Sequence, residues 1–86
     1  MNSSFPTSGI RTKTLAELLP GEAGTVTAVK GEHHLALHIL EIGLVQGAKV
    51  RFLRAAPLGD PIQVEVDGFL LSLRKKEAQT VIVEIL

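Results

Sequence analysis

A predicted β-hairpin in the second half of this 86-residue chain constrains its fold more than any other feature. Ile62, Val64 and Val66 alternate with polar residues, which is the period-two pattern of a strand with one buried face. Asp67-Gly68 supplies the two positive-φ positions of a two-residue hairpin turn. We therefore predict that the chain returns along the same buried face through Phe69, Leu71 and Leu73.

A proline-rich corner precedes this hairpin. Pro57 and Pro61 enclose Leu58-Gly59-Asp60, and neither a helix nor a central strand can cross two prolines at this spacing. One strand must end before the corner and the next must begin after it. We expect Asp60 to hydrogen-bond within the corner itself, as aspartate does in many turns.

The remaining segments alternate between helix and strand patterns. We predict a short helix over 14–19, a strand with a bulge over 22–30, a helix over 32–42 and strands over 48–53 and 81–86. Residues 74–78 form a charged connecting segment, compatible with a helix, before the last strand. Gly43 is placed to end the main helix in the left-handed conformation, with Leu44 packing back on Ile39.

The predicted fold class is mainly β with short helices: a small, strongly bent antiparallel barrel with the helix 32–42 covering one opening. A chain of this length supports one core, so we assign a single domain to residues 10–86. Residues 1–9 are rich in Ser, Thr, Pro and Gly, and we expect them to be disordered. The predicted core consists of Val50, Phe52, Ile62, Val64, Val66, Phe69, Leu71, Leu73, Val81 and Val83.

Composition narrows the classes of function. Nine basic and nine acidic residues cancel, whereas nucleic-acid or membrane-surface partners usually require a basic excess, so we expect no nucleic-acid binding. Without cysteine there is neither a disulfide framework nor a thiolate metal site. No signal peptide or membrane span is recognisable, which predicts a soluble cytoplasmic protein without direct membrane insertion. No catalytic motif is present, and we expect no enzymatic activity.

Two histidines on the predicted helix are candidate metal ligands. His34 and His38 lie one turn apart, the spacing that lets two imidazoles share a divalent ion such as zinc, and Glu41 follows on the same side. The alternative, which we favour, is a polar stripe that faces solvent. Seven helical residues span roughly 10 Å, so Glu41 does not easily join His34 on one ion. A tight site would draw ligands from a second molecule, and zinc would then promote a homodimer.

Three leucines are predicted at the surface, where polar side chains would be expected if the surface only faced solvent. Leu37 and Leu44 lie off the core stripe of the helix, and Leu58 lies in the exposed corner. We predict that these side chains border a docking site for another protein. The corner residues Pro57, Leu58, Gly59, Asp60 and Pro61 complete that predicted site.

Four stretches of the sequence resemble the ferrous iron transport protein A family (FeoA) across residues 14–85. They are LAELLPGEAGTVTAV, HILEIGLVQGAKV, AAPLGDPI and LSLRKKEAQTVIVE. The resemblance implies an SH3-like barrel, a cytosolic location and an accessory role in Fe(II) uptake by the membrane permease FeoB, whose cytosolic part carries a GTPase domain. His38 stands where the family commonly has arginine.

Two functional hypotheses follow. In the first, which we favour, the protein is an interaction module that needs no cofactor and docks on the GTPase-bearing part of FeoB through Leu37, Leu44 and the corner 57–61. Its partner would recruit it to the inner face of the membrane. In the second, the protein is a metal-binding accessory or metal-responsive module that holds zinc or iron at His34 and His38, with Glu41 nearby.

Overall fold

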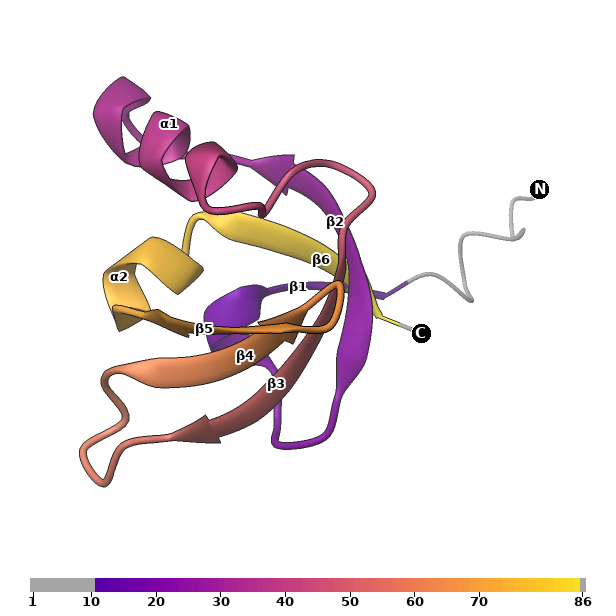
Figure 1. The fold of residues 1–86 in the computed structure, drawn as a ribbon, viewed down its shortest axis with the longest axis vertical. Helices are drawn as coiled ribbons and strands as arrows, with labels where there is room; N and C mark the ends of the chain where they lie inside the picture. Colours follow the sequence, from indigo (N-terminus) through magenta and orange to yellow (C-terminus); the bar gives the residue numbers. More distant parts are fainter. Residues whose placement is uncertain (1–10, 86) are drawn as a thin grey trace, which may run out of the picture.

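Six antiparallel strands form one strongly curved sheet, and a single main helix lies over one of its open ends (Figure 1). The computed structural model describes residues 11–85. In chain order the elements are β1 (Thr12–Thr14), the 3₁₀ turn η3 (Leu15–Glu17), β2 (Ala23–Val29), α1 (His33–Glu41), β3 (Lys49–Ala55), β4 (Ile62–Val66), β5 (Phe69–Leu73), α2 (Lys75–Ala78) and β6 (Val81–Ile85). The strand order across the sheet is β1-β6-β2-β3-β4-β5. The predicted mainly-β barrel is confirmed, while the prediction for residues 1–9 lies outside the described residues.

β2 carries the curvature of the sheet. It pairs with β3 at one end and with β6 along its length, and its register with β6 shifts between Val26 and Ala28, which confirms the predicted bulge. β6 passes very close to Gly24. A Cβ at Gly24 would overlap the Glu84 carbonyl oxygen and lie 2.5 Å from Val83 Cγ1, so the sheet needs glycine at this crossing.

Two elements were not predicted. β1 pairs with β6, with Thr12 opposite Glu84 and Thr14 opposite Ile82, although its sequence Thr-Lys-Thr has no apolar alternation. The segment 75–78, predicted only as a charged connection, forms the short helix α2. At its start the Glu77 carboxylate accepts a hydrogen bond from the Arg74 N–H at 2.8 Å. β1 depends on pairing with a strand that is distant in sequence, and α2 depends on a charged capping residue. A periodic pattern of apolar residues reveals neither of them.

The core lies inside the curved sheet and beneath α1 and η3. Its buried members are Leu15, Leu18, Val26, Ile39, Leu44, Ala48, Val50, Phe52, Ile62, Val64, Val66, Leu73, Ala78, Val81 and Val83. All the predicted core residues are buried except Leu71, which is half-buried, and Phe69, which is 74 % exposed.

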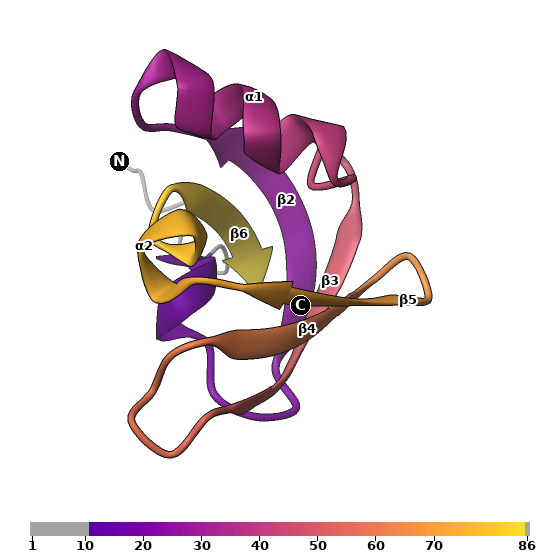
Figure 2. The same ribbon diagram turned by 60° about the vertical axis from the view of Figure 1, so that its left-hand side comes forward.

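The prediction that Phe69 belongs to the core is wrong. Phe69 lies directly opposite Val66 and so points to the same side of the hairpin, as the alternation indicated. The hairpin, however, extends beyond the body of the barrel at this end (Figure 2). None of the elements within residues 11–85 covers Phe69 there, and 74 % of its side chain is exposed.

α1 has well-defined ends. The Glu32 carboxylate accepts a hydrogen bond from the Leu35 N–H at 2.6 Å and caps the start of the helix. At the other end Gly43 has a φ of 107°, and the Leu44 N–H donates to the Ile39 carbonyl at 3.2 Å, which confirms the predicted left-handed cap. Within residues 11–85 no helix is long and apolar enough to cross a membrane.

The helix cap also removes Leu44 from the surface. Its side chain is fully buried, with 0 % exposed, because the cap turns the chain back onto the core. Leu44 therefore cannot border a docking site, and that part of the prediction is wrong.

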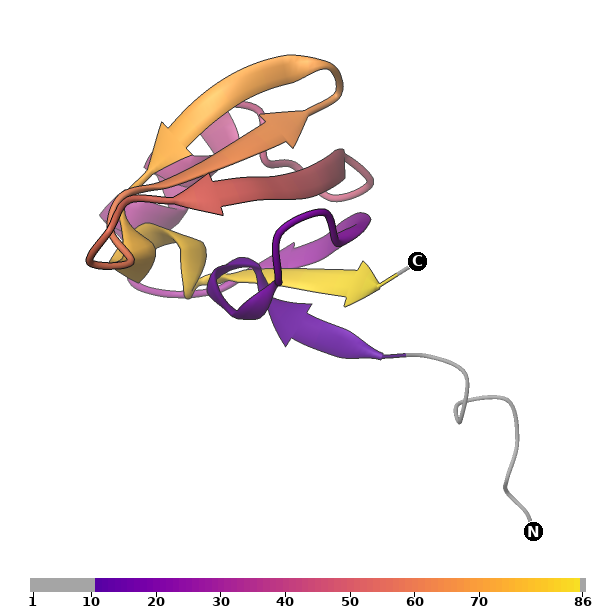
Figure 3. The same ribbon diagram turned by 90° about the horizontal axis from the view of Figure 1, so that it is seen from below.

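Asp60 connects the proline corner to α2. Its Oδ1 accepts a hydrogen bond from the Lys75 N–H at 3.0 Å, across fifteen positions of sequence. The corner projects from one end of the sheet, where Figure 3 shows it at the left. The expectation that Asp60 hydrogen-bonds within its own corner is wrong, since this carboxylate oxygen bonds the first backbone N–H of a helix that only the fold brings near.

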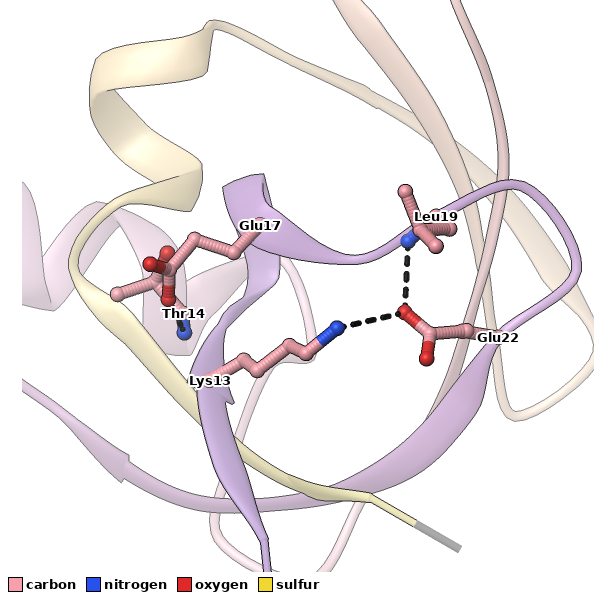
Figure 4. A network of polar contacts seen from close by, with 5 residues as sticks. All are labelled: Lys13, Thr14, Glu17, Leu19 and Glu22. Atoms are coloured by element: carbon pink, nitrogen blue, oxygen red, sulfur yellow. Dashed lines mark hydrogen bonds and ion pairs between the residues drawn. The ribbon is translucent and has the colours of Figure 1, made fainter.

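A small polar network fixes the turn between β1 and β2 (Figure 4). The Thr14 N–H donates to Glu17 Oε1 at 2.8 Å, as the capping-box spacing predicted. Glu22 Oε1 accepts from the Leu19 N–H at 2.8 Å and from Lys13 Nζ at 3.2 Å. The hydrogen bond from Leu19, followed by the one from Lys13, lowers the pKa of the Glu22 carboxyl below its ordinary value.

Acidification should remove the stability that Glu22 contributes. Because the pKa of Glu22 is lower in the folded chain than in the unfolded chain, its contribution is complete above the ordinary pKa of about 4.5 and is lost as the pH falls through the lower folded-state value. Melting temperatures measured from neutral pH to about pH 3 should therefore fall less steeply in Glu22→Gln than in the parent. Equal slopes for the two proteins would show that the network does not favour the charged carboxylate.

Candidate functional site

An apolar groove is lined by the residues that directly follow α1 and by the β4–β5 hairpin. Its volume is about 490 Å³. The lining residues are Ile42, Gly43, Val66, Asp67, Phe69, Leu70 and Leu71. Phe69 and Leu70 are 74 % and 69 % exposed, which is unusual for two adjacent large apolar side chains.

The backbone holds the hairpin side of the groove in place. Asp67 and Gly68 have φ values of 48° and 90°, the left-handed conformations of a tight two-residue turn. The Asp67 N–H donates to the Lys49 carbonyl at 2.9 Å, and Asp67 Oδ1 accepts from the Lys49 N–H at 3.1 Å. These two hydrogen bonds anchor the turn to β3 and hold the strand that carries Phe69 and Leu70 in place.

Phe69 and Leu70 were missed as surface residues, although the sequence contains a signal. A hairpin strand with one wet face should carry a polar residue after Phe69, but Leu70 and Leu71 follow it directly. The run Phe-Leu-Leu therefore places an apolar side chain on each face of the strand. This signal places Leu70 on the solvent-exposed face, but it does not indicate that Phe69 is exposed as well.

The predicted docking residues that remain at the surface lie elsewhere. Leu37 on α1 is 45 % exposed, and Leu58 at the tip of the corner is 95 % exposed. The hollow beside the corner has a volume of about 310 Å³, and its lining includes Arg54, Gln63 and Ser72. It shares no lining residue with the apolar groove and is the more polar of the two.

The predicted metal ligands His34, His38 and Glu41 are all exposed on α1. His38 Nε2 lies 3.3 Å from Glu77 Oε2 on α2, a neighbour that the sequence did not indicate. In the part of the chain that the structure describes, no three His, Asp or Glu side chains are grouped closely enough to hold one ion. A metal site at His34, His38 and Glu41 stays a prediction.

A small, strongly curved antiparallel sheet with one covering helix defines a small β-barrel of the SH3-like class. The chain belongs to the FeoA domain family, whose model matches residues 13–85. The resemblance noted in the sequence is thereby confirmed.

Solved structures of FeoA proteins have the same fold. The chain is similar to the FeoA protein of Chlorobium tepidum, with 44 % identity and a TM-score of 0.78 over 86 % of this chain and 70 % of that one. It is also similar to Stenotrophomonas maltophilia FeoA, described as a prokaryotic SH3 domain protein and solved in complex with zinc. That match has 33 % identity and a TM-score of 0.72, and it covers 83 % of this chain and 88 % of that one.

One relative joins this kind of domain to a transporter. Over 72 residues the chain is 32 % identical to an Fe(2+) transport protein A/Fe(2+) transporter FeoB fusion protein of Porphyromonas gingivalis. The match covers 84 % of this chain but only 8 % of the fusion protein. In that organism an FeoA-like segment and FeoB are parts of one polypeptide.

Proposed function

We propose that this chain is a cytoplasmic, non-catalytic accessory protein of ferrous iron uptake, which binds the cytosolic, GTPase-bearing part of an FeoB transporter through the apolar groove. The observation that carries the proposal is the exposure of Phe69 and Leu70 on an anchored hairpin. Aromatic side chains such as that of Phe69 contribute strongly to the energetics of protein interfaces.

The volume of the groove and the apolar side chains around it are suitable for this role. Its volume of about 490 Å³ lies within the range of about 300–1,000 Å³ that ligand pockets in proteins have. Fully burying one large apolar side chain contributes about 1.5–3 kcal/mol. Burial of the exposed Phe69 side chain in an interface would therefore contribute favourably to a reversible contact.

The fused relative supports FeoB as the partner. When two domains share one polypeptide, each is held at a high effective concentration near the other, which favours a functional contact between them. A contact of this kind needs an exposed surface on the FeoA domain, and the apolar groove is the surface that we propose for it.

Calorimetric titration with the purified cytosolic part of the FeoB transporter tests the proposal. We expect saturable binding of similar affinity in the presence of a chelator and in the presence of Fe(II) or Zn(II), because the groove residues are apolar and are not metal ligands. Absence of binding in every condition would refute the proposal. Binding that requires added metal would instead favour the second candidate below.

The second candidate is a metal-responsive module, and the contact between His38 and Glu77 favours it. Nε2 of His38 and Oε2 of Glu77 are 3.3 Å apart, so an imidazole nitrogen and a carboxylate oxygen already face each other between α1 and α2. Zinc binds both kinds of ligand in tetrahedral sites. His34 lies one helical turn from His38, and a second copy of the chain would supply the ligands that remain.

Zinc should then promote a dimer of the parent protein but not of the His34→Ala/His38→Ala variant. His33→Ala is the matched control, since His33 is exposed beside His34 but lies off their shared face. The effect should disappear when a chelator removes the zinc. Sedimentation velocity measures it directly, and mass distributions that zinc leaves unchanged in all three proteins would exclude this candidate.

A further inference from the structure

We propose that β5 is a pairing edge, to which an extended segment of the partner adds as a further antiparallel or parallel strand. The inference rests on the proposed function, and it specifies how the partner is recognised. The segment would carry apolar side chains at alternate positions, and acidic residues at the end that meets the basic run Arg74-Lys75-Lys76.

The sheet ends at β5. In the strand order β5 is paired only with β4, and among residues 11–85 no further strand lies beyond it. The hairpin that contains it stands away from the body of the barrel near Asp67-Gly68 (Figure 2). Phe69, Leu70 and Ser72 of this strand are all exposed.

The backbone pattern identifies the groups that face outward. The Asp67 N–H donates to Lys49 on β3, so the next residue back, Val66, turns its backbone groups toward β5. Val66 is paired with Phe69, and the alternation along β5 then directs the backbone groups of Leu70 and Ser72 away from β4. Leu70 and Ser72 therefore offer two N–H donors and two carbonyl acceptors to an added strand.

The β5 edge lacks the features with which proteins usually protect an exposed edge. Its sequence, Phe-Leu-Leu-Ser-Leu, has neither a charged residue nor a proline, and its register with β4 has no bulge. The opposite edge of the sheet differs, because β1 has only three residues and carries Lys13 at its centre. The two edges of the same sheet are thus built differently, and only β5 is suited to pairing.

The surroundings of β5 indicate the chemistry of the added segment. The apolar groove flanks the strand on the side of Phe69 and Leu71, where it would receive alternate apolar side chains. Arg74, Lys75 and Lys76 follow the strand, are exposed and make no ion pair within residues 11–85. Acidic residues at that end of the partner segment would complement this charge.

A second copy of this chain fits the edge less well. Pairing that uses both outward-facing residues of each copy would set Leu70 opposite Ser72 and Phe69 opposite Leu73. Leu73 is only 1 % exposed and already belongs to its own core, so it cannot fill the groove of another copy. A partner segment with a free apolar side chain at that position can fill it.

Ser72→Pro and Ser72→Ala form a matched pair of variants. Both lose the hydroxyl, but only proline removes the outward N–H, and a proline is tolerated where that N–H does not pair within the sheet. In calorimetric titration with the cytosolic part of FeoB, Ser72→Pro should bind about tenfold more weakly, while Ser72→Ala should bind like the parent. Hydrogen exchange of the unaltered protein gives a second measurement: the Leu70 and Ser72 amides should exchange fast when free and slowly in the complex.

Each other outcome rejects strand addition. If the parent binds but the Leu70 and Ser72 amides stay unprotected and Ser72→Pro binds normally, strand addition is wrong while the proposed function remains. If the parent does not bind the cytosolic part of FeoB, both fail together. If the two amides become protected in the protein alone as its concentration rises, the edge pairs with a second copy and not with the transporter.

Discussion

Phe52→Ala should lower the free energy of unfolding by about 3–5 kcal/mol, whereas Phe69→Ala should lower it by less than about 1 kcal/mol. The two residues have the same side chain but opposite environments. Phe52 is 5 % exposed and lies opposite Val64 in the centre of the sheet, while Phe69 is 74 % exposed at the end of the hairpin. Truncating Phe52 removes a large buried group and leaves a cavity, whereas truncating Phe69 removes a group that is mostly in water.

Urea denaturation of both variants beside the parent measures this difference. A domain of this size has a total stability on the order of 4–13 kcal/mol, so Phe52→Ala should lose a large share of it and unfold at a clearly lower urea concentration than the parent. Phe69→Ala should retain the midpoint of the parent within a small shift. A loss of several kcal/mol in Phe69→Ala would show that the hairpin packs on the core in solution.

Phe69→Asp should weaken binding to the cytosolic part of FeoB by at least about tenfold without unfolding the protein. The substitution places a carboxylate in the apolar groove, where burial against the partner would leave it without a counter-charge. Because Phe69 contributes little to the core, the fold should persist, as circular dichroism can verify.

Leu58→Asp is the control for this prediction. Leu58 is 95 % exposed, so an aspartate is tolerated there, and it lies in the proline corner away from the groove lining. We expect Leu58→Asp to bind like the parent. If Leu58→Asp loses binding and Phe69→Asp keeps it, the partner docks at the corner 57–61, as first predicted from the sequence.

Local sequence patterns correctly predicted the elements that depend only on neighbouring residues. The alternation around Asp67-Gly68 predicted the hairpin, and Gly43 with Leu44 predicted the helix cap, because each depends on neighbouring residues. The Leu44 example also shows the limit of such patterns. Leu44 was predicted both to pack back on the helix as part of its cap and to lie at the surface. The structure shows that the chain turns back at this point and buries the Leu44 side chain.

Features that depend on distant residues could not be predicted. Period-two alternation shows which side chains share a face but not where that face is covered, and this is why Phe69 was placed in the core. The hydrogen bond of Asp60 to the Lys75 N–H and the approach of His38 to Glu77 join segments far apart in the chain. The candidate groove has the same origin, since its two walls come from Ile42 and Gly43, which follow α1, and from the hairpin.

The most direct test of the proposed role is an NMR titration of the isotopically labelled protein with the unlabelled cytosolic part of FeoB. We expect the largest changes in the amide signals at Ile42, Gly43 and 66–71, which line the groove, and smaller ones elsewhere. Changes confined to the corner 57–61 or to His34 and His38, or a spectrum that the transporter fragment leaves unaltered, would contradict docking through the groove.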